Sequence, residues 1–124
     1  MFRGVLIDQS VPRPEVILKL TEVVSYRETT LESESFRGKV LFHNIKVSDK
    51  NLWHVLYEVM QSIKSPGWFF HLVSDDLLYI VMPNAILTST NDEKELMNIF
   101  DYAIHHGIHP KQLDLKKLFS NPFS

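Results

Sequence analysis

Two apolar runs joined by a short acidic turn occupy the middle of the sequence, within GWFFHLVSDDLLYIVMPNAILTS at positions 67–89. Aromatic and β-branched residues favour strands, whereas Ser74, Asp75 and Asp76 favour a turn, because an aspartate side chain can bond its own backbone. The Pro-Asn pair at 83–84 marks a second turn. The segment therefore predicts a hairpin followed by a short third strand, and a hairpin this apolar constrains the rest of the chain to cover it.

Two amphipathic segments can provide that cover. The first, SDKNLWHVLYEVMQSIKSPG at 48–67, begins at Ser48, which can cap a helix, and ends where Pro66-Gly67 prevents continuation. Its apolar positions share one helical face, namely Leu52, Val55, Leu56, Val59, Met60 and Ile63. The second opens on a capping box from Thr90 to Glu93, and its apolar face holds Leu96, Ile99, Phe100 and Ala103. Both segments are predicted to be helices.

Three further segments read as strands, namely FRGVLI at 2–7, EVVSYRETTLE at 22–32 and KVLFHNIKV at 39–47. A short helix is expected from Pro14 to Leu20, and the polar stretch SESFRG at 33–38 is expected to be a loop. The order of these strands and helices along the chain predicts an α+β fold. We expect an antiparallel-rich sheet with the two main helices on one face, in a ferredoxin-like arrangement.

Chain length and composition predict one domain. The 124 residues are 44% hydrophobic, enough for one compact core. We expect residues 1–115 to form a single α+β domain and residues 116–124 to form a C-terminal tail, which Leu118, Phe119 and Phe123 could dock onto the domain.

Charge, cysteine content and hydropathy exclude several classes of partner. The chain has 13 basic and 15 acidic side chains, so it lacks the positive field that nucleic acid binding requires. It has no cysteine, which removes disulfides, thiolate zinc sites and thiol nucleophiles. The apolar run LLYIVM stops at Pro83, too short to span a bilayer, and the N-terminus lacks the apolar core of a signal peptide. We expect a cytoplasmic protein with no nucleic acid or membrane partner.

The segment AIHHGIH at 103–109 could be a metal site or a helix end. If Gly107 is the left-handed residue after the last helical turn, Ile108 can close back on Ala103, and Pro110 prevents continuation. A zinc site would need His105 and His109 with a third ligand such as Asp101, whereas adjacent His105 and His106 point in divergent directions. The spacing favours a helix end, and no metal is expected.

The sequence also carries none of the motifs that bring chemistry by themselves. It has no glycine-rich phosphate loop, no G-x-S-x-G elbow and no H-E-x-x-H pair. No cofactor is therefore expected, and the enzyme class stays open with a preference for a protein without catalytic activity.

Three segments resemble a family of small uncharacterised prokaryotic α+β proteins: GVLIDQS near the start, PGWFFHLVSDDLLYIVMPNAIL in the middle and FDYAIHHGIHPKQLDL near the end. The positions that carry this resemblance are Trp68, Phe69, His71, Gly107, Ile108, Pro110, Gln112, Leu113 and Asp114. Pro83 departs from the pattern, which has a basic residue there, and the residues after Leu115 are additional. The resemblance implies the fold and no established activity.

The register of the central hairpin leads to the main functional hypothesis. If its loop has three residues, Val73 pairs with Leu77, and His71 lies opposite Tyr79 on one face. That face, with Phe69, His71, Tyr79 and Val81, would be open and too apolar to face water. We therefore expect a non-enzymatic binding or protein-interaction module that self-associates or meets a protein partner through these residues.

The alternative hypothesis is a small enzyme or small-molecule-binding protein with a pocket around His71 and Tyr79. His43 shares strand parity with Leu41, Ile45 and Val47. It could join the pocket, so that the three side chains act as acid, base and hydrogen-bond donor. The other interpretation of His43 is a core or interface histidine whose ring is satisfied by a hydrogen bond.

Overall fold

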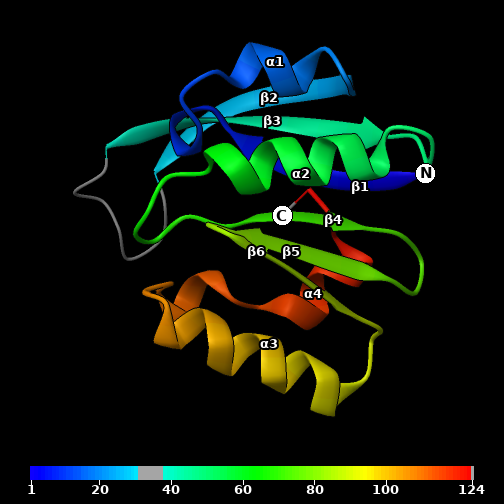
Figure 1. Cartoon of the computed structure of the whole chain (residues 1–124), viewed down its shortest axis with the longest axis vertical. Helices are drawn as coiled ribbons and strands as arrows, with labels where there is room; N and C mark the ends of the chain where they lie inside the picture. Colours follow the sequence, from blue (N-terminus) through cyan, green and yellow to red (C-terminus); the bar gives the residue numbers. More distant parts are fainter. Residues whose placement is uncertain (31–37, 124) are drawn as a thin grey trace.

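A computed structural model describes residues 1–30 and 38–123. Within these residues the chain forms a six-stranded antiparallel sheet with the order β2-β3-β1-β4-β5-β6 (Figure 1). The strands are β1 (Phe2–Ile7), β2 (Glu22–Thr30), β3 (Lys39–Val47), β4 (Phe70–Val73), β5 (Leu78–Met82) and β6 (Ala85–Ser89). The predicted α+β class and antiparallel sheet are confirmed. The end of the predicted strand at 31–32 and most of the predicted loop at 33–38 lie outside the described residues.

Four α-helices accompany the sheet in the described part of the chain. They are α1 (Pro14–Leu18), α2 (Leu52–Ser62), α3 (Glu93–His105) and α4 (Leu115–Ser120), with short 3-10 turns η1 (Asp8–Ser10) and η3 (Pro110–Gln112). Helices α2 and α3 match the two amphipathic segments of the sequence. Helix α4 was not predicted, because a six-residue helix offers too little periodicity to be recognised.

The helices lie on both faces of the sheet. On β5, Tyr79 and Val81 join the core cluster that contains the buried stripe of α2, whereas Leu78 and Ile80 join the cluster that contains α3. Alternate residues of a strand point to opposite faces, so α2 and α3 cover opposite sides. We name these sides the α2 face and the α3 face. The predicted placement of both helices on one face, and with it the ferredoxin-like arrangement, is not confirmed.

The central strand β1 requires a glycine where it meets β4. Gly4 lies opposite Leu72 in the β1–β4 ladder and opposite Ile45 in the β1–β3 ladder. A Cβ atom at Gly4 would overlap the backbone carbonyl oxygen of His71. Close approach of the two backbones therefore depends on the missing side chain.

Both ends of α3 are closed by hydrogen bonds. The carboxylate of Asp92, rather than Thr90, caps the helix by accepting from the backbone N–H of Glu95 at 3.0 Å, and Glu95 Oε1 accepts from the backbone N–H of Thr90 at 3.0 Å. The predicted capping box thus begins two residues later than expected. At the other end Gly107 has φ +92°, and the N–H of Ile108 donates to the carbonyl of Ala103 at 3.0 Å. The predicted helix end at Gly107 is confirmed.

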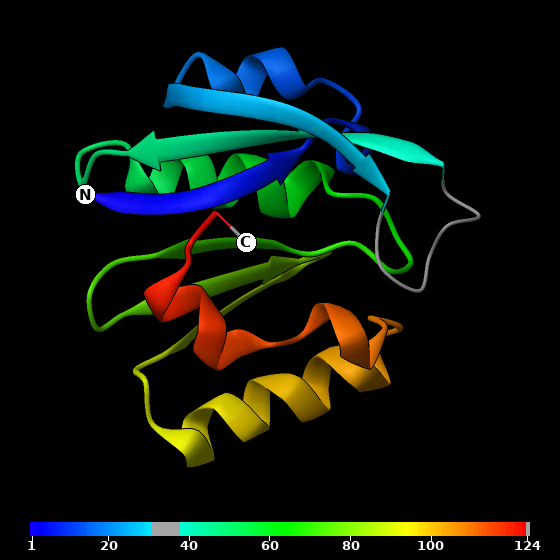
Figure 2. The ribbon, with the colours of Figure 1, turned by 180° about the vertical axis from the view of Figure 1, so that it is seen from behind.

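The C-terminal segment packs against the α3 face. Leu115 and Leu118 of α4 are buried in the cluster that holds α3, and Figure 2 shows α4, in red, in front of the middle of the sheet. The segment predicted as a tail, 116–124, therefore contains most of a helix, and its Leu118 is buried against the domain. Among the described residues, no helix has the length and apolar character needed to cross a membrane.

Candidate functional site

The central hairpin has a register one residue away from the prediction. Val73 pairs with Leu78, so His71 lies opposite Ile80, and Tyr79 lies opposite Leu72. The loop has four residues, and the N–H of Ser74 donates to the carbonyl of Leu77 at 2.9 Å. Because the side-chain period of a strand is two, this shift moves Tyr79 to the face opposite that of His71. The predicted His71–Tyr79 pair is wrong.

The predicted interface is largely inside the chain. Val81 is fully buried, and Tyr79 and His71 are 8% and 5% exposed, while Phe69 is half-buried. Tyr79 packs between Phe2 and Trp53, with ring centroids 5.7 and 5.5 Å away. The expectation that these residues form an open sheet face is wrong, because α2 covers one side of the hairpin and α3 with α4 covers the other.

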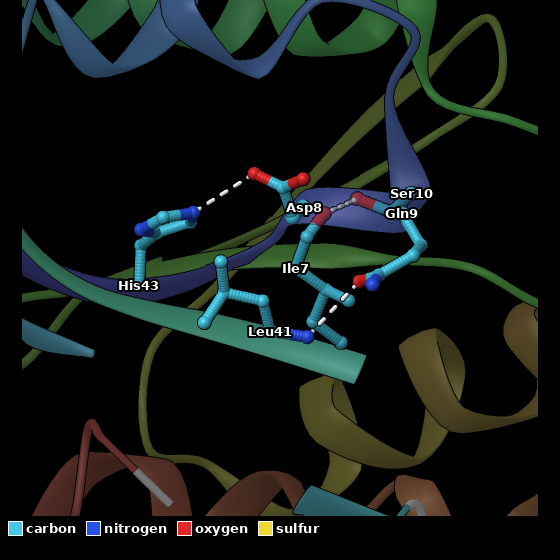
Figure 3. Close-up of polar contacts among 6 residues, drawn as sticks. All are labelled: Ile7, Asp8, Gln9, Ser10, Leu41 and His43. Carbon is cyan, nitrogen blue, oxygen red and sulfur yellow. Dashed lines mark hydrogen bonds and ion pairs between the residues drawn. The ribbon is translucent and has the colours of Figure 1, made fainter. Parts of the chain in front are cut away.

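His43 belongs to a separate polar cluster at the end of β1. Its Nε2 donates to Asp8 Oδ1 at 2.9 Å, and Figure 3 shows the carboxylate directed at the ring. In the same turn Gln9 Oε1 accepts from the backbone N–H of Leu41 at 3.0 Å, and the Ser10 hydroxyl donates to the carbonyl of Ile7 at 2.7 Å (Figure 3). These bonds attach η1 to β3, which gives His43 a hydrogen-bonded structural role.

His43 does not share a pocket with the other two candidates. It lies on the α2 face, because it pairs with Leu6 of that core cluster, whereas His71 lies on the α3 face. Tyr79 is on the α2 face too, but strands β1 and β4 stand between β3 and β5. The structure therefore brings no two of His43, His71 and Tyr79 together.

Two histidines at or just after the end of α3 form hydrogen bonds with nearby backbone groups. His106 Nδ1 donates to the carbonyl of Tyr102 at 2.8 Å, and His109 Nδ1 accepts from the backbone N–H of Lys111 at 3.1 Å. The rings of His105 and His106 stand 70° apart. Over residues 1–30 and 38–123, no group of three His, Asp or Glu side chains is arranged to hold a metal ion.

A cleft of about 350 Å³ opens on the α3 face around His71. In Figure 2, α3 and α4 lie beside β4–β6, and no helix of the described part of the chain lies over β1–β3 on this face. We call this space the His71 cleft. The described residues that line it are Val5, Ile7, Arg27, Thr29, Thr30, Phe42, Gly67, Trp68, Phe69, His71, Lys111, Gln112, Asp114, Lys117 and Leu118.

His71 is a neutral polar group in the wall of this cleft. Its Nε2 lies 2.7 Å from the backbone oxygen of Pro122. A carbonyl only accepts, so Nε2 carries the ring proton and Nδ1 carries the lone pair. Burial lowers the pKa of His71 to about 4, and the bond to Pro122, which favours the charged form, opposes this only in part. At neutral pH the ring is therefore uncharged and holds the C-terminal segment against β4.

Arg27 provides a fixed positive charge at the opposite side of the cleft. Its guanidinium lies over the Phe42 ring, 4.8 Å from the centroid, and its Nη1 donates to Asn44 Oδ1 at 3.4 Å. The Asn44 amide in turn donates to the Ser25 hydroxyl at 2.9 Å. Stacking on one ring and one hydrogen bond restrict the side chain while leaving other guanidinium N–H groups to donate elsewhere.

The charged groups around the cleft are mainly positive. Among the described lining residues, Arg27, Lys111 and Lys117 are basic and Asp114 is acidic. All four are exposed, whereas the apolar floor of Val5 and Phe42 is buried. The cleft thus combines an apolar floor, an aromatic wall that includes Trp68, and a net positive rim.

The prediction from sequence found His71 but not the cations that surround it. Arg27, Lys111 and Lys117 come from β2, η3 and α4, so no local spacing connects them. A weaker signal was present: among the positions that carry the family resemblance, Trp68, Phe69, His71, Gln112 and Asp114 all line the cleft.

No protein-family model matches the sequence, and no curated protein or solved structure is significantly similar to it. The resemblance drawn from the three segments therefore stays a prediction, and the candidate site rests on its geometry.

Proposed function

We propose that this protein is a binding module for a small anionic molecule with an apolar or planar part, held in the His71 cleft. The observation that carries the proposal is the cleft itself, in which Arg27, Lys111 and Lys117 surround an apolar, aromatic floor. The volume of about 350 Å³ lies at the lower end of the range typical of small-molecule sites. This favours a ligand the size of a substituted ring system.

Electrostatics supports an anion rather than a cation or a neutral ligand. Positive side chains that converge above low-dielectric walls attract and orient negative charge more strongly than dispersed surface lysines do. Arg27 can bind a carboxylate, sulfonate or phosphate with two N–H groups at once. The Trp68 side chain, which also lines the cleft, adds aromatic surface to the wall against which the planar part of the same molecule would lie.

Binding without catalysis fits the state of His71 better than an enzyme does. General bases work best with a pKa near the operating pH, whereas burial holds the pKa of His71 at about 4. Its protonated nitrogen is occupied by the Pro122 carbonyl. The ring therefore serves as a neutral polar contact and as the anchor of the C-terminal segment.

The interaction hypothesis is not retained at the central hairpin, since three of its four residues are buried there. Its other part, a second copy of the chain as partner, does not need that surface.

A matched pair of dyes tests the proposal. We expect 8-anilinonaphthalene-1-sulfonate to bind in the cleft, with fluorescence enhancement that saturates at one site. We expect the uncharged analogue N-phenyl-1-naphthylamine to bind about tenfold more weakly, or by about 1.4 kcal/mol, because it lacks the sulfonate that the basic side chains of the cleft would contact. Equal affinity for both dyes would contradict an anion site.

Two lysines on the same helix give the control. Lys117 lines the cleft, whereas Lys116 points to Glu93, with Nζ 3.2 Å from Oε1. Lys117→Gln should weaken binding of the sulfonated dye several-fold, and Lys116→Gln should leave it unchanged. If both substitutions have the same effect, the dye responds to overall charge and the cleft is not the site.

A further inference from the structure

Strand β2 forms one edge of the sheet and exposes nearly its whole length. Within residues 1–30 and 38–123 it pairs with β3 alone, and each of its nine residues except Thr29 is exposed. Its apolar side chains are among the most exposed in the described chain, with Val23 at 44%, Val24 at 48% and Tyr26 at 73%. Helix α1 lies near this edge in Figure 1, but it packs inward through Ile17.

An edge strand of this kind can pair with another strand, because one side of its backbone presents N–H and C=O groups without a neighbouring strand. Proteins commonly protect such edges with charged side chains, above all lysine, with proline, with a bulge or with a very short strand. Within Glu22–Thr30 there is neither lysine nor proline. The one irregularity is a bulge between Val23 and Ser25. Apart from this bulge and its charged side chains, the nine-residue strand carries none of these protections.

We propose that β2 pairs with β2 of a second copy of this chain, antiparallel and about a two-fold axis, with Glu22 of each copy opposite Arg27 of the other. This inference goes beyond the proposed function. Arg27 belongs to both surfaces, so the dimer is tested by mass without ligand and the cleft by the Lys117 variant. In a two-fold interface each contact occurs twice, so a self-complementary strand is required. The sequence EVVSYR at 22–27 is of that kind.

Charge and side-chain direction both support this register. Glu22 and Arg27 pair with Lys46 and Phe42 of β3, which are four residues apart and therefore on the same face. Residues directly opposite each other in a ladder share a face, so Glu22 of each copy would lie beside Arg27 of the other. The Arg27 guanidinium, which stacks on Phe42 and bonds to Asn44 in the single chain, would also have to reach this carboxylate to form the two ion pairs. The same register places Val23 of one copy opposite Tyr26 of the other.

A shift by one residue would be unfavourable. It would place Glu22 opposite Glu28, two like charges, and would match residues that point to opposite faces. A shift that brought the two Arg27 side chains opposite each other would be repulsive as well. The Glu22–Arg27 register avoids both of these contacts.

Solution mass by light scattering at several concentrations tests the pairing. We expect a species of twice the 14.5 kDa chain mass that dissociates on dilution. Glu22→Lys places a lysine opposite Arg27 and should weaken dimerisation about tenfold, because two attractive contacts become repulsive. Adding Arg27→Glu to Glu22→Lys exchanges the charges and should restore the dimer, with circular dichroism confirming that each variant is folded.

Glu28→Lys is the control, since it makes the same charge change in the same strand but lies opposite neither Glu22 nor Arg27 in this register. It should leave the dissociation constant of the dimer unchanged, whereas in the shifted register it would strengthen the dimer. A monomer at every concentration would overturn the proposal. A dimer that resists Glu22→Lys, or that the double exchange does not restore, would overturn the register.

Discussion

At the scale of single residues, His71 connects the sheet to the C-terminal segment. It is a polar side chain in an apolar strand, kept uncharged by burial and satisfied by one carbonyl at 2.7 Å. A charged imidazolium at this position would lack the solvation that it has in water. Charging the ring therefore lowers the stability of the folded chain.

Because His71 is buried and neutral, we predict that the unfolding free energy of the chain depends on pH. The pKa of His71 is about 4 in the folded chain and near 6.5 in the unfolded chain, so the unfolded chain takes up the proton first as the pH falls. The contribution of His71 is constant above pH 6.5, and about 3 kcal/mol of unfolding free energy is lost between pH 6.5 and 4. Urea unfolding at a series of pH values measures this loss.

His71→Gln is the comparison, because its amide can still donate to the Pro122 carbonyl but does not titrate in this range. The difference in unfolding free energy between wild type and variant should shrink as the pH falls from 6.5 to 4. Parallel curves over that range would show that His71 is not the buried, neutral group described here.

His71 could be identified from the sequence as a notable residue, but its partner could not be placed. A histidine within an apolar strand signals a buried polar group that needs a hydrogen bond. The partner, Pro122, is 51 residues away along the chain, and the helix that brings it back was not predicted. The sequence therefore indicated His71 as a notable residue, but it did not indicate the contact with Pro122.

At the scale of secondary structure elements, the junction of β1 and β4 depends on Gly4. Gly4→Ala should lower the unfolding free energy by about 3 kcal/mol, because its Cβ would overlap the rigid backbone of β4 and force the two strands apart. Gly38→Ala is the control: Gly38 has φ +69° and open space where a Cβ would lie, so only left-handed strain of about 1 kcal/mol applies. Urea unfolding measures both values, and equal losses would contradict the close approach at Gly4.

Helices were predicted better than strand pairings, for a physical reason. The stripe of α2 and the Gly107 end of α3 are local patterns, and both are confirmed. The β4–β5 register was wrong by one residue. Both faces of that hairpin are apolar, so alternation could not tell a three-residue loop from a four-residue loop.

At the scale of the whole molecule, the sheet is covered unequally. Helices α1 and α2 pack on one face, while α3 and α4 cover the β4–β6 half of the other, which leaves the His71 cleft beside it (Figure 2). The α+β class could be predicted from the order of elements. The cleft could not, because it forms where β2, β4, η3 and α4 meet, and their contacts depend on a register and a helix that sequence patterns missed.

The proposed function requires that the His71 cleft, and not another surface, binds the anionic ligand. A shallow apolar groove between α3 and α4, lined in part by Met97, Phe100 and Leu115, is the competing surface in the described chain. The most direct measurement is two-dimensional NMR of ¹⁵N-labelled protein titrated with 8-anilinonaphthalene-1-sulfonate. We predict saturable shifts at the amides of Val5, His71 and Leu118. Shifts confined to the α3–α4 groove, or shifts that never saturate, would contradict the proposed site.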